Sequence, residues 1–189
     1  MPKSVIIDAV RSPIGLKNGQ LVGLRPDDLS AQIIIGLLKR TPNLDPKLIE
    51  DLIFGCAFPE GPQGMLISKG ISILAGLPET TAGSVVNRFC GSSMDALHQV
   101  SSKIECGDIE VGIAGGVEDM FSVPMGGFNP DFHPDLADQE YYIGMGETAE
   151  TLALEGKISR QEQEDFALNS HEKALHAQSN GRFDNEIIS

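Results

Sequence analysis

The chain has 189 residues, of which 41% are hydrophobic and 22% are charged, a composition typical of one globular domain or of one domain plus part of a second. The 27 acidic and 14 basic side chains give a net charge of −13, and no basic cluster is present that could follow a nucleic-acid backbone. No apolar run approaches the roughly 20 residues that a membrane-spanning helix needs.

The three cysteines are Cys56, Cys90 and Cys106, and no two of them form a Cys-x-x-Cys pair. An odd number at these spacings argues against a disulfide framework and against a zinc site, so no metal is expected. Free thiols indicate a reducing compartment. The residues that follow Met1 resemble neither a signal peptide nor an Arg-rich presequence. We therefore expect a cytoplasmic protein.

Strand-like and helix-like segments alternate along the first two thirds of the chain. Strands are expected over residues 5–10, 51–57, 84–89 and 109–114. Helices are expected over residues 29–40, 65–75 and 92–105. This alternation predicts an α/β fold with a largely parallel sheet, right-handed crossovers and helices on both faces.

The pattern changes after the fourth expected strand. Residues 121–144 are rich in Gly, Pro, Asp and aromatic residues and predict a long irregular excursion. Helices are expected over residues 148–155 and 159–180; the second begins with a Ser-x-x-Glu capping box and ends before Gly181, and residues 186–188 look like the start of another strand. We assign residues 1–120 to an α/β domain and residues 121–189 to part of an inserted domain with two helices.

Cys90 is the strongest catalytic candidate. It lies where the third expected strand ends, and Gly91 leads directly into a helix. Unpaired backbone N–H groups and the helix dipole at such a position favour a thiolate, which is a good nucleophile for acyl transfer. The alternative interpretation is a buried structural thiol. Cys56 and Cys106 have no evident activator and are expected to be structural.

A nucleophilic cysteine usually needs a base, and no histidine is clearly placed for this role. His98 follows Cys90 by eight positions on the same expected helix, which is about 12 Å along the helix axis. His171 and His176 lie five residues apart, which is the wrong spacing for a metal pair on one helix face. His133 lies in the irregular excursion.

The run Asn-Arg-Phe-Cys-Gly-Ser-Ser-Met at residues 87–94 resembles the active-site cysteine segment of thiolases. Further stretches that resemble this family, in the family's order, are residues 8–15, 115–120, 124–125, 145–150, 158–163 and 181–187. The segments Cys-Gly-Ser-Ser-Met and Asp-Phe-His-Pro are most similar to 3-ketoacyl-CoA thiolases of bacterial fatty-acid β-oxidation.

The resemblance implies a thiolase-like layered fold with a mixed, largely parallel sheet and an inserted loop domain. It implies that Cys90 accepts an acyl group from 3-ketoacyl-CoA and passes it to CoA, or runs the reverse Claisen condensation. Coenzyme A and acyl-CoA are then substrates, and no cofactor is expected. Met145 matches a loop-domain methionine that packs near the CoA pantetheine, but the histidine that often precedes it is replaced here by Gly144.

Other parts of the thiolase machinery are implied to come from the family's second half. These are a histidine that activates the cysteine, a second acid–base cysteine and an Asn-bound water; the Gly-His-Pro and Cys-x-Gly motifs that carry the first two do not follow Cys90 here. We therefore expect these 189 residues alone to be inactive. The resemblance also implies a homodimer or tetramer and a hydratase/dehydrogenase partner subunit.

Two alternatives remain open at this point. One is a non-catalytic, thiolase-like module that binds a lipid or a partner protein. The other is a condensing enzyme similar to a ketoacyl synthase, which the residues around Cys90 and the Met-Gly-Glu-Thr-Ala-Glu stretch at 145–150 favour less than a thiolase.

Overall fold

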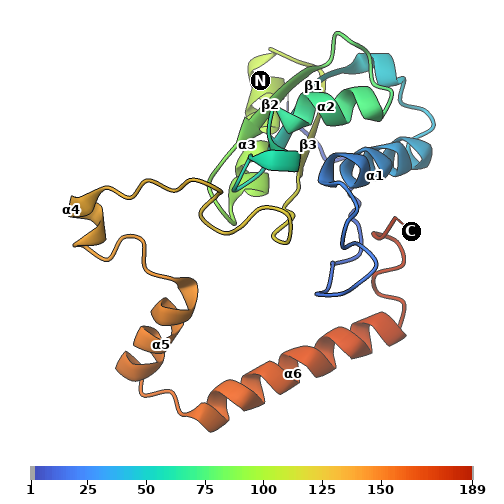
Figure 1. Cartoon of the computed structure of the whole chain (residues 1–189). Helices are drawn as coiled ribbons and strands as arrows, with labels where there is room; N and C mark the ends of the chain where they lie inside the picture. Colours follow the sequence, from blue (N-terminus) through green and yellow to red (C-terminus); the bar gives the residue numbers. More distant parts are fainter. Residues whose placement is uncertain (1–2, 189) are drawn as a thin grey trace. The chain divides into compact units, whose positions relative to one another are not determined.

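The computed structural model describes residues 3–188, which divide into two compact units (Figure 1). The first unit contains the chain up to Asn129 together with the segment from Glu186 onward, and the second is Pro130–Asn185. The division into domains at residue 120 stays a prediction.

A parallel sheet forms the centre of the first unit. Its strands are β1 (Ile49–Gly55), β2 (Ala82–Val86) and β3 (Val111–Gly116), in the order β2-β1-β3, and both pairings are parallel. The central strand β1 is buried along almost its whole length, as expected for a parallel strand that is covered on both faces. The expectation of an α/β fold with a largely parallel sheet is confirmed.

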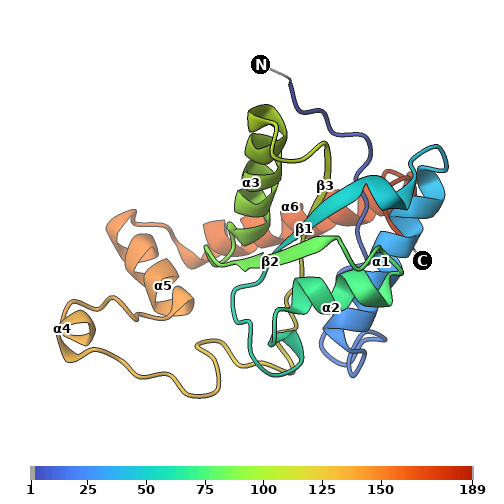
Figure 2. The ribbon, with the colours of Figure 1, turned by 90° about the horizontal axis from the view of Figure 1, so that it is seen from above.

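Helices cover both faces of this sheet (Figure 2). Successive side chains of β1 point to opposite faces, so Leu52 packs with α1 (Pro26–Arg40) and α2 (Ile67–Leu74), whereas Ile53 packs against α3 (Ser92–Cys106). The two hydrophobic clusters lie on opposite sides of the strand, which gives the unit its three layers.

In the first unit, the starts of helices α1 and α2 differ from the sequence expectation for identifiable local reasons. Helix α1 begins at Pro26 rather than Leu29, because proline is favoured in the first turn, where its missing N–H costs nothing. Helix α2 begins at Ile67 rather than Met65, because Met65 and Leu66 have φ angles of 51° and 57°. Left-handed residues cannot continue a right-handed helix, so the helix starts after them.

The expected strand over residues 5–10 is wrong. The segment belongs to no hydrogen-bonded ladder, and Val5, Ile6 and Ile7 are exposed. Two cavities, of about 880 and 500 Å³, are each lined by residues of this segment and of β3. The intrinsic preference of β-branched residues for strands does not by itself supply a backbone partner in the sheet.

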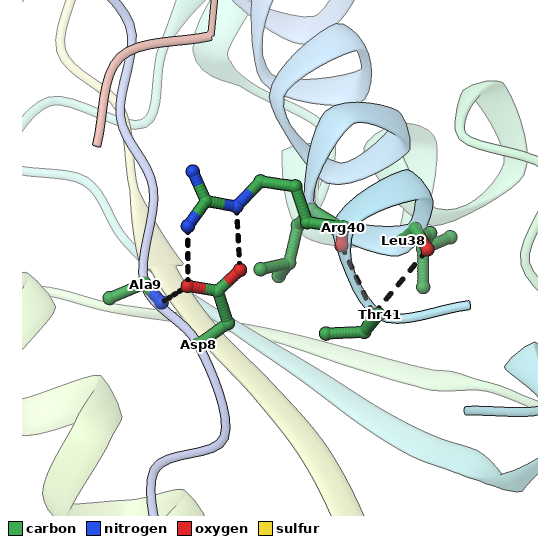
Figure 3. A network of polar contacts seen from close by, with 6 residues as sticks. Asp8, Ala9, Leu38, Arg40 and Thr41 are labelled. Carbon is green, nitrogen blue, oxygen red and sulfur yellow. Dashed lines mark hydrogen bonds and ion pairs between the residues drawn. The ribbon is translucent and has the colours of Figure 1, made fainter. Parts of the chain in front are cut away.

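Side-chain contacts hold this N-terminal segment instead (Figure 3). The Asp8 carboxylate accepts hydrogen bonds of 2.7 and 3.0 Å from the guanidinium of Arg40, in the last turn of α1. These bonds lower the pKa of Asp8, and a third from the Ala9 N–H adds to the effect. Nearer the N-terminus, the Ser4 and Ser101 hydroxyls lie 2.7 Å apart.

The expected strand start at residues 186–188 forms a single bridge rather than a strand. The Arg11 N–H donates to the Glu186 carbonyl at 2.8 Å, and the Ile188 N–H donates to the Arg11 carbonyl at 2.9 Å. The Arg11 guanidinium also pairs with the Glu186 carboxylate at 2.7 Å. These contacts bring the two ends of the first unit together.

The second unit contains α4 (Pro134–Ala137), α5 (Met145–Glu155) and α6 (Arg160–Ser179), none of which has a buried residue. The short helix α4 was not expected from the sequence. The capping box of α6 is confirmed: the Ser159 hydroxyl accepts from the Glu162 N–H at 3.3 Å, and the Glu162 carboxylate accepts from the Ser159 N–H at 2.8 Å. No helix within residues 3–188 combines the length and apolar composition that crossing a membrane requires.

Candidate active site

Cys90 lies in the connection between β2 and α3, at the carboxyl edge of the parallel sheet. Its side chain is exposed and its thiol is free. Ligands of open α/β sheets bind at this edge, where the loops that follow the strands meet the N-termini of helices. The sequence expectation that Cys90 lies between a strand end and a helix start is therefore confirmed as a position in the fold; its catalytic role stays a prediction.

The backbone around Cys90 turns sharply. The Gly91 N–H donates to the Arg88 carbonyl and the Ser92 N–H donates to the Phe89 carbonyl, both at 3.0 Å. Phe89 has a φ of 47°, in the left-handed region that a residue with a bulky side chain rarely adopts. Such a conformation costs on the order of 1–3 kcal/mol and persists only where the surroundings hold it, which is common at functional sites.

The first turn of α3 rests directly on the ends of two strands. A Cβ atom added at Gly55, the last residue of β1, would lie 2.4 Å from the backbone nitrogen of Ser93. A Cβ at Gly116, the last residue of β3, would lie 1.9 Å from the Ser93 Oγ. Only glycine permits this approach, so the sheet fixes the helix terminus that follows Cys90.

Ser92 closes the turn from the inside. Its Oγ accepts a hydrogen bond from the Arg88 N–H at 2.9 Å and donates one to the Phe89 carbonyl at 2.6 Å, and the residue is only 3% exposed. On the outside, the Arg88 guanidinium pairs with the Asp95 carboxylate in the first turn of α3 at 3.1 Å. Both contacts span Cys90 without touching it.

Asn87 ties the same turn to the segment that follows β1. Its Nδ2 donates to the Ala57 carbonyl, and its Oδ1 accepts from the Phe89 N–H, each at 2.8 Å. The second bond is an Asx-turn, in which an asparagine side chain replaces a backbone acceptor. The rings of Phe58 and Phe89 also meet, with centroids 5.9 Å apart.

The structure places no histidine of residues 3–188 in a hydrogen bond with Cys90. His98 lies exposed on α3, and His171 and His176 lie on α6. His133 caps α4, where its Nδ1 accepts from the Asp135 N–H at 3.2 Å. Within the same residues, no group of three or more His, Cys, Asp and Glu side chains could hold a metal ion.

The other two cysteines differ sharply in environment. Cys56 follows β1 and is only 1% exposed, whereas Cys106 is the last residue of α3 and is exposed. Burial, with a contribution from the negative charge of Glu118, raises the pKa of the Cys56 thiol to about 11. A protonated buried thiol is a poor nucleophile, so the environment of Cys56 favours a structural role.

We expect iodoacetamide at pH 8 to alkylate Cys90 and Cys106 in the native chain while Cys56 reacts at least about 100-fold more slowly, since each unit of raised pKa removes about a factor of ten in thiolate. Because the pKa of Cys56 is raised, its alkylation should accelerate as the pH rises toward 11. Peptide mass spectrometry distinguishes the three sites. Labelling of Cys56 as fast as Cys106 in the folded chain would contradict the buried placement.

Met145 is the first residue of α5 and is exposed, in a different unit from Cys90. The residue before it, Gly144, donates its N–H to the Glu147 carboxylate at 3.1 Å, and this contact starts the helix three residues earlier than expected. The role of Met145 in binding CoA stays a prediction.

Comparison with known protein families gives a match over almost the whole chain. The family described as "Thiolase, N-terminal domain" matches residues 4–189. The chain belongs to the thiolase family. The resemblance drawn from the motif around Cys90 is thereby confirmed.

Full-length thiolases among the relatives extend beyond this chain. The 3-ketoacyl-CoA thiolase of Aliivibrio salmonicida is 46% identical over 191 aligned positions, which cover 100% of this chain and 49% of the relative. The 3-ketoacyl-CoA thiolase of Photobacterium profundum is 45% identical with the same coverage, and that of Aeromonas salmonicida is 44% identical. The chain thus spans about half the length of the curated relatives it matches.

Sequence reasoning missed the polar side chains that hold the turn around Cys90 and the loops beside it. Asn87 and Ser92 could have been found from the local sequence. An Asn in a turn and a Ser at the start of a helix commonly form hydrogen bonds with nearby backbone groups. Gln63 and Glu118 carried no such local signal: they meet from distant positions, and only the fold brings them together.

Proposed function

We propose that this chain carries the acyl-accepting cysteine of a thiolase that cleaves 3-ketoacyl-CoA with CoA, and that Cys90 is that cysteine. The observation that carries the proposal is the placement of an exposed thiol on a strained turn directly before the N-terminus of α3, at the carboxyl edge of the sheet. The relatives named above support the choice of substrate class.

The reaction requires two substitutions at carbonyl carbon. In the first, the Cys90 thiolate attacks the 3-keto carbon, the bond between C2 and C3 breaks, and acetyl-CoA leaves after its C2 takes up a proton. In the second, the thiolate of a CoA molecule attacks the Cys90 thioester, and the cysteine sulfur leaves as a thiolate. The products are acetyl-CoA and a shortened acyl-CoA, and the reverse sequence is a Claisen condensation.

The position of Cys90 suits both steps. Helix α3 begins at Ser92, two residues after Cys90, so the thiol lies next to a helix N-terminus. Helix N-termini in general interact favourably with negative charge, and charge develops on the sulfur in both steps. The exposed Met145 at the start of α5 contributes apolar contact to the CoA pantetheine in this proposal. The setting we propose is bacterial fatty-acid β-oxidation in the cytoplasm, in a homodimer or tetramer with a hydratase/dehydrogenase partner subunit.

The test is transfer of an acyl group from butyryl-CoA to the chain. We expect one butyryl adduct on Cys90, formed by thioester exchange with release of CoA. We expect no repeated turnover of 3-ketoacyl-CoA, because the Gly-His-Pro and Cys-x-Gly motifs that the resemblance implies for acid–base catalysis do not follow Cys90 here. Intact-mass and peptide spectra measure the adduct.

Two variants make this test specific. The adduct should disappear in Cys90→Ser and persist in Cys106→Ser, which removes the other exposed thiol of the same helix region. Acylation that survives Cys90→Ser would contradict the assignment. No adduct on the unaltered chain would favour a non-catalytic module that binds a lipid or a partner.

A further inference from the structure

Two loops at the carboxyl edge of the sheet are joined by one fully buried amide. Gln63 is 0% exposed and donates from Nε2 to the Phe58 carbonyl at 2.9 Å and to the Glu118 carboxylate at 3.0 Å. Its Oε1 accepts from the Asp119 N–H. Donors and acceptor are all occupied, so the amide has one favourable orientation, and it connects the loop after β1 to the loop after β3.

The Glu118 carboxylate extends this connection toward Cys90. Its second oxygen accepts from the Ala57 N–H at 2.6 Å. The Ala57 carbonyl in turn accepts from Asn87, whose other side-chain atom accepts from the Phe89 N–H, directly before Cys90. A continuous series of hydrogen bonds therefore runs from the end of β3, through the residue that follows Cys56, to the turn that carries the exposed thiol.

We propose that Asn87 and Glu118 are positioning residues for Cys90: together they fix the Phe89–Cys90 backbone relative to the strand ends. This inference rests on the proposed acyl transfer. Neither side chain bonds the sulfur, so both act through Ala57 and Phe89. The strained φ of Phe89 requires such an external restraint, because without it the turn would relax toward a commoner conformation.

The chemical consequence is a rate effect rather than a binding effect. Attack on a thioester carbonyl needs the sulfur to approach along a narrow path, and misplacement by about 1 Å costs up to about 100-fold in rate. The restraint is built from contacts that do not depend on the substrate. Loss of either residue should therefore slow acylation at saturating acyl-CoA while leaving the half-saturating concentration unchanged.

The experiment measures butyryl transfer from butyryl-CoA to Cys90 in the full 189-residue chain for Asn87→Ala, Glu118→Ala and the double variant. We expect each single variant to slow transfer at saturation by about 10-fold, with less than about a twofold change in the half-saturating concentration. Because the two residues act in series through Ala57, the double variant should also be about 10-fold slower, not about 100-fold. Asn169→Ala, on the exposed surface of α6, is the matched control and should leave the rate unchanged.

Two further variants separate positioning from general destabilisation. Asn87→Asp keeps the acceptor for the Phe89 N–H but replaces the donor to Ala57 by a charged acceptor that faces the Ala57 carbonyl, so it should be slow although the turn keeps its internal bond. Glu118→Gln keeps one acceptor, for the Ala57 N–H, but turns its NH2 group toward the Gln63 amide donor, so it should recover part of the rate lost in Glu118→Ala. Hydrogen exchange of β1 amides should match the unaltered chain in every variant, which shows that the sheet is intact.

The outcomes distinguish this inference from the function it rests on. If the unaltered chain is acylated and the variants match Asn169→Ala, the positioning role is overturned and the proposed function stands. If the rate losses of the two single variants multiplied in the double variant, Asn87 and Glu118 would act independently, and the connection through Ala57 would be overturned. If the unaltered chain takes no acyl group, the proposed function fails first, and the positioning role fails with it.

Discussion

Replacing Gly55 by alanine is expected to destabilise the α/β unit by about 3 kcal/mol, toward the upper end of the usual cost of overpacking. The added Cβ would lie 2.4 Å from the Ser93 nitrogen and 2.5 Å from the Ser92 carbonyl carbon. Both are backbone atoms of the first turn of α3, so no side-chain rotation relieves the contact. The helix terminus must move, and the turn that carries Cys90 moves with it.

The measurement uses Cys56 as a reporter, because it is buried at the end of the same strand. The chain has no tryptophan and both tyrosines lie at positions 141 and 142, so intrinsic fluorescence reports on the second unit only. Pulsed alkylation of Cys56 across a urea series gives the free energy of unfolding of the α/β unit. We also expect the rate of butyryl transfer to Cys90 to fall by at least about 10-fold.

Gly70→Ala is the matched control. Gly70 lies within α2, and a Cβ there would meet no atom within 4 Å. Alanine in an open helical position is expected to stabilise the chain by about 0.5–1 kcal/mol, because it lowers the conformational entropy of the unfolded state. Equal stability of the Gly55 and Gly70 variants would refute the close approach of α3 to the end of β1.

The sheet was predictable because its central strand is apolar on both faces. Residues 49–55 are buried almost continuously, and the strand-like and helix-like segments alternate in sequence order, so the layers followed from local patterns. The segment over residues 5–10 has the same β-branched character and still forms no strand. Strand preference is local, but pairing depends on a free edge at the right distance, which no local pattern specifies.

The candidate site shows the same division between local and non-local information. The position of Cys90 between the end of a strand and the start of a helix could be predicted, because the residues directly before and after it indicate both elements. The geometry of the turn could not be predicted, because it depends on contacts between residues that lie 30 or more positions apart in the sequence. These are the packing of α3 against Gly55 and the hydrogen bond from Asn87 to Ala57. The position of the candidate cysteine was therefore easier to predict than the contacts that orient it.

Replacing Ile71 by alanine is expected to destabilise the α/β unit by about 3–4 kcal/mol, within the range for removing a large aliphatic side chain from a closed core. Ile71 lies in α2, is 0% exposed, and packs in the cluster that contains Leu52 and Phe54 of the central strand. The loss includes both the transfer of the side chain from water and the cavity that its neighbours cannot fill. Because this cluster is on the face opposite α3, the turn at Cys90 should keep its shape.

Ile73→Ala separates this effect from a change in helix preference. Ile73 lies two residues further along the same helix and is 60% exposed. Alanine is the better helix former by a few tenths of a kcal/mol, so this variant should change stability by less than about 1 kcal/mol. Pulsed Cys56 alkylation in urea measures both variants. If Ile73→Ala cost as much as Ile71→Ala, α2 would not bury the face that the structure assigns to it, and the placement of the sheet beneath Cys90 would need revision.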